Sequence, residues 1–116
     1  MNVGLKGTVE TLTGAFYEEA PEDTPYPYLV FTMKRISENG GMQTYILEVN
    51  AWDQHDFYSR AESLMDELEG ELHQRIHMTD EFLFRFFRGE RQNLPDTDKS
   101  IRRVREQFEM QVYEKV

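Results

Sequence analysis

The sequence ENGGMQTYILEVNAWD, residues 38–53, decides how this chain begins to fold. Its first four residues signal a turn, because Asn and Gly tolerate the positive φ angles of a tight hairpin. Residues 42–53 then alternate, with Tyr45, Leu47, Val49 and Ala51 pointing to one side. Before the turn, residues 28–35 are rich in β-branched and aromatic side chains and predict a partner strand. The two segments predict an antiparallel hairpin.

A long amphipathic helix is predicted directly after the hairpin. Residues 53–56 end the strand and offer a helix N-cap. Apolar residues then recur at steps of three and four: Phe57, Ala61, Leu64, Met65, Leu68, Leu72 and Ile76. A helix of this length measures about 30 Å and would cross a small sheet completely.

The remaining segments complete an α+β fold in one domain, residues 1–116. Residues 82–88 and 102–114 predict two further strands, and residues 18–27 and 89–100 predict long polar loops. Residues 1–14 predict a short helix or a loosely held arm. The expected order is (α)-β-β-α-β-β, a four-stranded and mainly antiparallel sheet with the one long helix packed on one face.

Composition excludes several classes of function. The net charge is −9, carried by the first 80 residues, and the basic residues gather near the C-terminal end. This acidic excess argues against duplex DNA as the main ligand. No apolar run approaches the roughly 20 residues of a membrane-spanning helix, and the N-terminus does not resemble a secretory signal. The chain has no cysteine, which fits a reducing cytoplasm and leaves no thiolate metal site.

Catalysis is unsupported by any motif, and we expect no cofactor. Two histidines, His73 and His77, are spaced as metal ligands on one helix face would be, and Glu69 lies one turn before His73, but nothing nearby resembles the HExxH motif. Solvated histidines near a helix C-terminus are the favoured interpretation. The arginines near the third strand could form a base-stacking platform, but we favour a phenylalanine core beneath the helix with solubilising arginines on the other side.

The predicted helix can cover only one face of the sheet. Ile46, Trp52, Leu83 and Phe87 then point the other way and predict a protein interface. The same region holds three arginines that we include in this interface: Arg85, Arg103 and Arg105. Alternatively, the N-terminal segment could fold over this face. We expect Trp52 and Phe87 to lie at or near a subunit contact.

The pattern resembles the small tail completion proteins of long-tailed bacteriophages, also called tail terminator or head–tail joining proteins. The sequence PYPYLVF, residues 25–31, is similar to the family's entry into its first hairpin strand. Residues 47–53 resemble its second strand, and Phe57, Ala61, Leu64, Met65 and Leu68 match the helix that follows. The likeness spans residues 25–113 and is mainly a pattern of elements.

This resemblance implies a non-enzymatic virion protein, made in the bacterial cytoplasm, that forms a homo-oligomeric ring, commonly a hexamer. The ring would cap the major tail tube protein and dock with the head connector, without reading a nucleic acid sequence or binding a membrane. An acidic inhibitor, or a nucleic-acid mimic that blocks a basic partner, is the alternative that the net charge of −9 suits.

Overall fold

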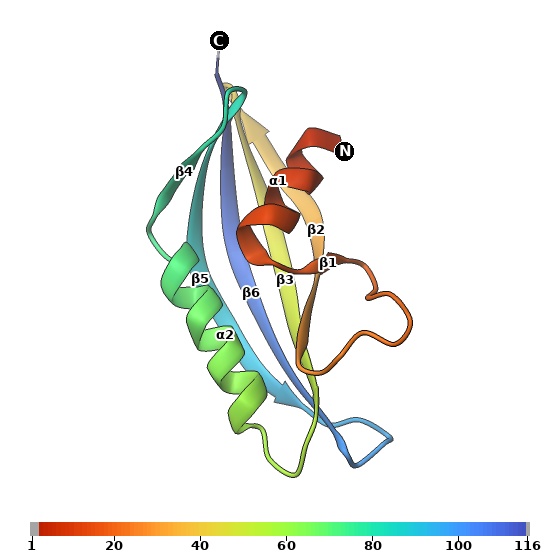
Figure 1. Ribbon diagram of the computed structural model, residues 1–116. Coiled ribbons are helices and arrows are strands. Elements are labelled where there is room, and N and C mark those ends of the chain that lie inside the picture. The colour runs from red at the N-terminus through yellow and green to blue at the C-terminus, as the bar shows by residue number, and fades with distance from the viewer. Residues whose placement is uncertain (1–2, 116) are drawn as a thin grey trace.

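Six strands form one mixed, curled sheet, and two short helices lie on one of its faces (Figure 1). The computed structural model describes residues 3–115. In chain order the elements are α1 (Val3–Thr13), β1 (Phe16–Tyr17), β2 (Tyr28–Asn39), β3 (Met42–Gln54), α2 (Ser59–Leu72), β4 (Ile76–Met78), β5 (Phe82–Leu94) and β6 (Ile101–Glu114). The sheet order is β1-β2-β3-β6-β5-β4, in which only the β1–β2 pair is parallel.

The predicted hairpin is confirmed. β2 and β3 pair from Tyr28 opposite Trp52 to Asn39 opposite Met42. Gly40 and Gly41 form the turn with φ angles of 58° and 85°, which only glycine adopts without strain. The hairpin runs along most of a molecule that measures 49 × 26 × 21 Å.

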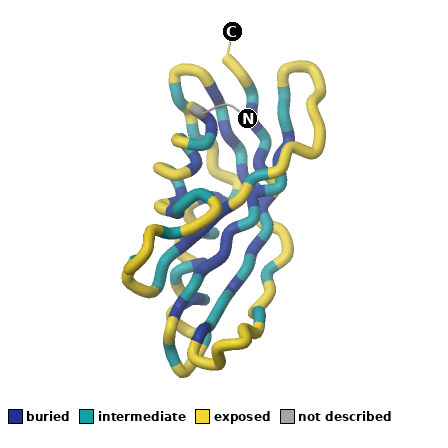
Figure 2. Tube along the Cα trace, turned by 90° about the vertical axis from the view of Figure 1, so that its right-hand side faces the viewer, coloured by how far each residue is buried: buried dark blue, intermediate teal, exposed yellow. Residues whose placement is uncertain are grey.

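The core lies between the two helices and one face of the sheet, which we call the inner face. Buried and partly exposed residues alternate along the strands, as period-two alternation requires (Figure 2). β3, β5 and β6 each send most of their buried apolar side chains to this face, and Ala61, Met65, Leu68 and Leu72 of α2 meet them. Leu5 and Val9 of α1 join the same cluster. The N-terminal helix therefore covers the inner face, and the alternative that it covers the opposite face is wrong.

The predicted four-stranded sheet is wrong, because two short edge strands, β1 and β4, extend it to six strands, and one predicted strand is longer than expected. Residues 89–94 continue β5 and pair with β6 as far as Leu94 opposite Arg103. This part of the strand is polar because Arg91 lies opposite the buried Glu106 and forms an ion pair with it. A short parallel strand, β1, adds a further strand at the β2 edge.

The single long helix is also wrong. α2 begins at Ser59 and ends at Leu72, because His73 has an extended ψ of 121° and Gln74 a positive φ of 61°. The chain then forms β4, which pairs with residues 83–85 of β5. Phe57 and Ile76, the two ends of the predicted stripe, lie outside the helix and are 67% and 60% exposed.

Gly89 should tolerate no side chain, because it stands at a bulge in β5 against the backbone of β6. A Cβ atom there would lie 2.6 Å from the carbonyl oxygen of Gln107. We expect Gly89→Ala to lower the free energy of unfolding by about 1–3 kcal/mol, measured by urea denaturation. Gly70→Ala is the matched control: space around Gly70 in α2 is open, so this change should stabilise by about 0.5–1 kcal/mol. Equal effects of the two substitutions would contradict the close approach at Gly89.

Candidate protein interface

The predicted interface residues all lie on the outer face, by which we mean the sheet face away from both helices. Each alternates along its strand with residues of the inner core, and each is partly exposed: Ile46, Trp52, Leu83, Arg85, Phe87, Arg103 and Arg105. The strand registers place Trp52 beside Arg103 and Ile46 beside Glu109, which in turn neighbours Phe87. That this face is an interface stays a prediction.

The Trp52 end of the outer face is an aromatic cluster. The guanidinium of Arg103 lies 4.9 Å from the centre of the Trp52 ring, and its Nε donates a 2.8 Å hydrogen bond to Oδ1 of Asn50. Tyr28 is the cross-strand neighbour of Trp52 and stacks on Tyr26 at 5.3 Å between ring centres. Sequence reasoning missed the two tyrosines, although the hairpin register alone places Tyr28 opposite Trp52.

Phe87 belongs to a second cluster on the same face. The guanidinium of Arg85 lies 5.3 Å from the centre of the Phe87 ring, so each end of the outer face holds one arginine on one aromatic ring. Ile46 and Phe87 stand six residues along the strands from the Trp52 row. At about 3.3 Å per residue the clusters are roughly 20 Å apart. The outer face thus has two separate apolar centres.

The polar strip between these clusters is only partly neutralised. Nε of Arg105 lies 3.3 Å from Oε1 of Glu48, and its NH2 group donates to Gln92. By contrast, Arg103 and Arg85 form no ion pair within the described residues. Nε of Arg85 is buried without a hydrogen-bond partner there. The N–H groups of these two arginines that lie at the surface remain available to a partner that supplies acceptors.

An ion cluster on the inner face fixes α2 against the sheet. Arg91 of β5 donates to Glu106 at 2.6 Å, to Asp66 at 2.6 Å and to Glu69 at 2.9 Å. Arg88 adds a second contact to Glu69 at 3.0 Å. Sequence reasoning missed this cluster, but the strand pattern holds its signal, because Glu106 is in phase with the buried Val104 and Phe108.

Burial acts on the pKa of both glutamates in this cluster, Glu106 and Glu69. Burial, reinforced by the neighbouring Glu69, raises the pKa of Glu106 to about 7 despite the opposing Arg91. Burial alone would also raise the pKa of Glu69, but hydrogen bonds from Glu106, Arg88 and Arg91 reverse the shift and lower it. Oε2 of ionised Glu106 lacks a partner within the described residues. A proton on this oxygen would let it donate to Glu69.

A second ion pair joins the end of the hairpin to the start of α2. Asp53 is fully buried and receives hydrogen bonds from Nε and NH2 of Arg60, the first of them 2.9 Å long. These bonds lower the pKa of Asp53 against the opposing effect of burial. Asp53 therefore holds α2 through its side chain from within β3. The N-cap position itself is occupied by Tyr58, which makes no side-chain capping bond.

The structure places the two histidines in different elements. His73 caps the C-terminal end of α2 and accepts a 3.0 Å hydrogen bond from the amide of Arg88. His77 is in β4, against the ring of Phe86. They therefore do not share a helix face, and no group of three or more metal-ligating side chains occurs in residues 3–115.

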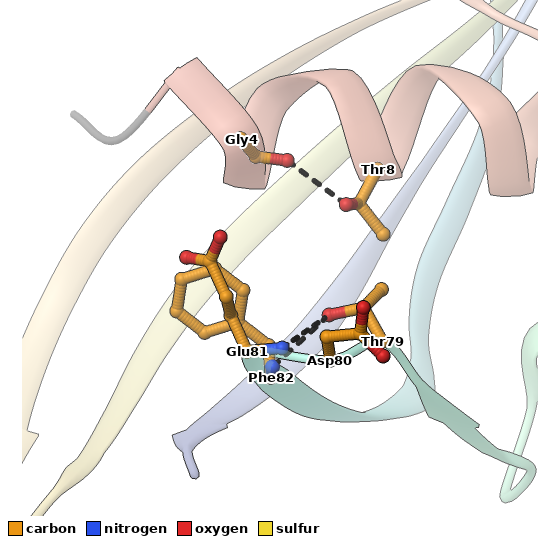
Figure 3. A pocket seen from close by; sticks show the side chains of 6 residues that line it. All are labelled: Gly4, Thr8, Thr79, Asp80, Glu81 and Phe82. Atoms are coloured by element: carbon orange, nitrogen blue, oxygen red, sulfur yellow. Dashed lines mark hydrogen bonds between the residues drawn. The ribbon is translucent and has the colours of Figure 1, made fainter. Parts of the chain in front are cut away.

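A shallow pocket of about 230 Å³ lies between α1 and the turn from β4 to β5 (Figure 3). Its threonines are engaged locally: Thr8 donates to the carbonyl of Gly4, and Thr79 accepts from the amides of Glu81 and Phe82. Its lining includes the carboxylates of Asp80 and Glu81, with no histidine or cysteine beside them.

Comparison with known proteins identifies a shared fold. No protein-family model and no curated protein sequence matches the chain. Among solved structures, a chain from the virion of a native gene transfer agent particle is similar, with a TM-score of 0.63 and 12% sequence identity. The match covers 97% of this chain and 89% of that chain.

Neither helix within residues 3–115 is long and apolar enough to cross a membrane.

Glu106 should make stability depend on pH. Its folded-state pKa of about 7 exceeds the ordinary 4.5, so the folded protein binds this proton more tightly than the unfolded chain. Its contribution is fully present below about pH 4.5 and is lost as pH rises through about 7, with at most about 3 kcal/mol at stake. We expect Glu106→Gln to remove this fall and to be more stable than wild type at pH 8, as measured by urea denaturation.

The control is Glu109→Gln, which removes a carboxylate from an exposed position of the same strand. It corrects for the change in net charge. If Glu106→Gln and Glu109→Gln change the pH profile equally, the raised pKa of Glu106 is contradicted.

Proposed function

We propose that this chain is a non-enzymatic structural component of a phage-type particle, located in the virion. The observation that carries the proposal is the fold shared with a chain of a gene transfer agent virion over 97% of this chain. Because that match also spans 89% of the other chain, it concerns the architecture of both proteins and not one common motif. Fold likeness alone transfers no activity, so the site must supply the rest of the argument.

The finer proposal is a tail completion protein that forms a ring on the tail tube and joins it to the head connector. The resemblance over residues 25–113 suggests this position. The outer face is consistent with it, because Trp, Tyr and Arg are the residues that dominate protein interfaces, and here they gather on a face that neither helix covers. The ring would be a homo-oligomer whose partners are the major tail tube protein and the connector.

The acidic-inhibitor alternative has less support. Two of the carboxylates that such a mimic would offer to a basic partner, Asp66 and Glu69, are already engaged with Arg91, and Glu106 is buried. The aromatic and arginine clusters of the outer face would also have no role in a nucleic-acid mimic.

The double variant Trp52→Ala/Phe87→Ala should fold but assemble poorly. It removes the aromatic centre of both outer-face clusters, so we expect self-association to weaken by at least tenfold, or about 1.4 kcal/mol, in sedimentation velocity experiments. Phe57→Ala is the matched control, because it removes a 67% exposed phenylalanine outside the sheet. Unchanged association of a folded double variant would disprove the assignment of these two residues.

The role in the particle is tested with tail tubes purified from the phage or prophage that carries the gene. Electron microscopy of tubes mixed with gold-labelled protein should show label at one tube end only. Deletion of the gene should yield separate heads and tails, and the wild-type protein added to the lysate should restore joining. Label along the whole tube, or normal particles without the gene, would contradict the tail completion role.

A further inference from the structure

The arginines on the two faces of the sheet differ in whether they form ion pairs. On the helix side, Arg60, Arg88 and Arg91 each form an ion pair with a carboxylate. On the outer face, Arg103 has its guanidinium against an indole ring and no carboxylate among the described residues. A cation on an aromatic ring at a partly exposed site keeps its free N–H groups available for a further acceptor. Arg103 therefore needs an anion that the described residues do not provide, whereas Arg105 already has Glu48.

Such anions stand unpaired on the opposite side of the same molecule. A shallow groove of about 90 Å³ runs between α1 and α2, and Leu29, Leu64 and Leu68 contribute its apolar lining. Glu67 and Glu71 also line this groove; both are exposed, and neither forms an ion pair within the described residues. Carboxylates at the rim of an apolar groove are complementary to an aromatic ring that carries an arginine.

The spacing of the charges also agrees. Glu67 and Glu71 are one helical turn apart, about 6 Å along α2. Arg103 and Arg105 point to the same side of β6 and are two residues apart, about 7 Å. A pair of guanidinium groups and a pair of carboxylates can thus meet in register, although Arg105 would share its charge with Glu48.

We infer that the outer face of one copy docks on the α1–α2 groove of a second copy, with Arg103 and Arg105 facing Glu67 and Glu71. Trp52 contributes the apolar contact beneath Arg103. The two surfaces lie on opposite faces of the sheet (Figure 1), so the contact is heterologous and repeats from copy to copy. This inference rests on the proposed ring and names the two surfaces that would build it.

Charge reversal tests the contact. Arg103→Glu/Arg105→Glu and, separately, Glu67→Lys/Glu71→Lys should each weaken self-association at least about 30-fold in sedimentation velocity. Glu18→Lys/Glu19→Lys is the matched control, because it reverses two exposed carboxylates in the loop after β1. This control should assemble at least as well as wild type. Circular dichroism and urea denaturation establish that each variant folds.

Mixing the two defective variants gives the sharper result. In an equimolar mixture, the reversed outer face of one variant meets the reversed groove of the other, and the two unmodified surfaces meet in turn. Assembly should therefore return, and native mass spectrometry should find the two variants alternating in even-numbered rings. A mixture that remains as dissociated as its components overturns the inference.

A crosslink covers the case of weak association. The sequence has no cysteine, so copies carrying Arg105→Cys can be mixed with copies carrying Glu67→Cys or Glu71→Cys and oxidised. We expect a disulfide-linked dimer with one of the two groove variants and none with Glu18→Cys. A monomeric wild type without any such crosslink also overturns the inference. A separate measurement determines whether the protein is incorporated into particles. If particles contain the protein but no crosslink forms, this contact is rejected while the proposed function stands.

Discussion

The covering of a single sheet face is the constraint on which the rest of this structure depends. Two helices of 11 and 14 residues can screen only one side of a sheet whose main strands are 12 to 14 residues long. Alternation along the strands sends most of the large apolar side chains to that side. The opposite side receives what remains, and its aromatic and arginine residues are more than a merely solubilising surface requires.

Ion pairs decide how those helices are held. Arg91 reaches from β5 to two carboxylates of α2 and to Glu106 within the sheet, while Arg60 reaches back to Asp53. Losing Arg60 would be costly, because the buried carboxylate of Asp53 would be left without compensation. These contacts fix the orientation of α2 over the sheet and hence the shape of its exposed side. The second half of β5 is polar because it carries Arg91, which pairs with Glu106.

The sequence allowed the hairpin, the position of a helix and the division of residues between the two faces to be predicted, since each follows from short-range periodicity. The extent of β5 and the end of α2 could not be predicted in this way. Residues 89–94 look like a loop until Glu106 of a distant strand supplies a partner for Arg91. Likewise, Ile76 continues the helical spacing and leaves the helix only because β4 pairs with β5. In both places, pairing with a strand distant in the sequence decided the structure against the local sequence pattern.

The aromatic pairs on the outer face show how the same limit applies to the site. Alternation placed Trp52, Phe87 and the arginines on one side, but not their grouping, because strand register sets which residues become neighbours. The register makes Arg103 and Tyr28 the neighbours of Trp52. Phe87 has Arg85 against its ring, and this second pair lies about 20 Å from the Trp52 cluster. Two separated cation–aromatic pairs on one face can fix both the position and the angle of a docked partner. A single central cluster would fix its position alone, and a closed ring requires both.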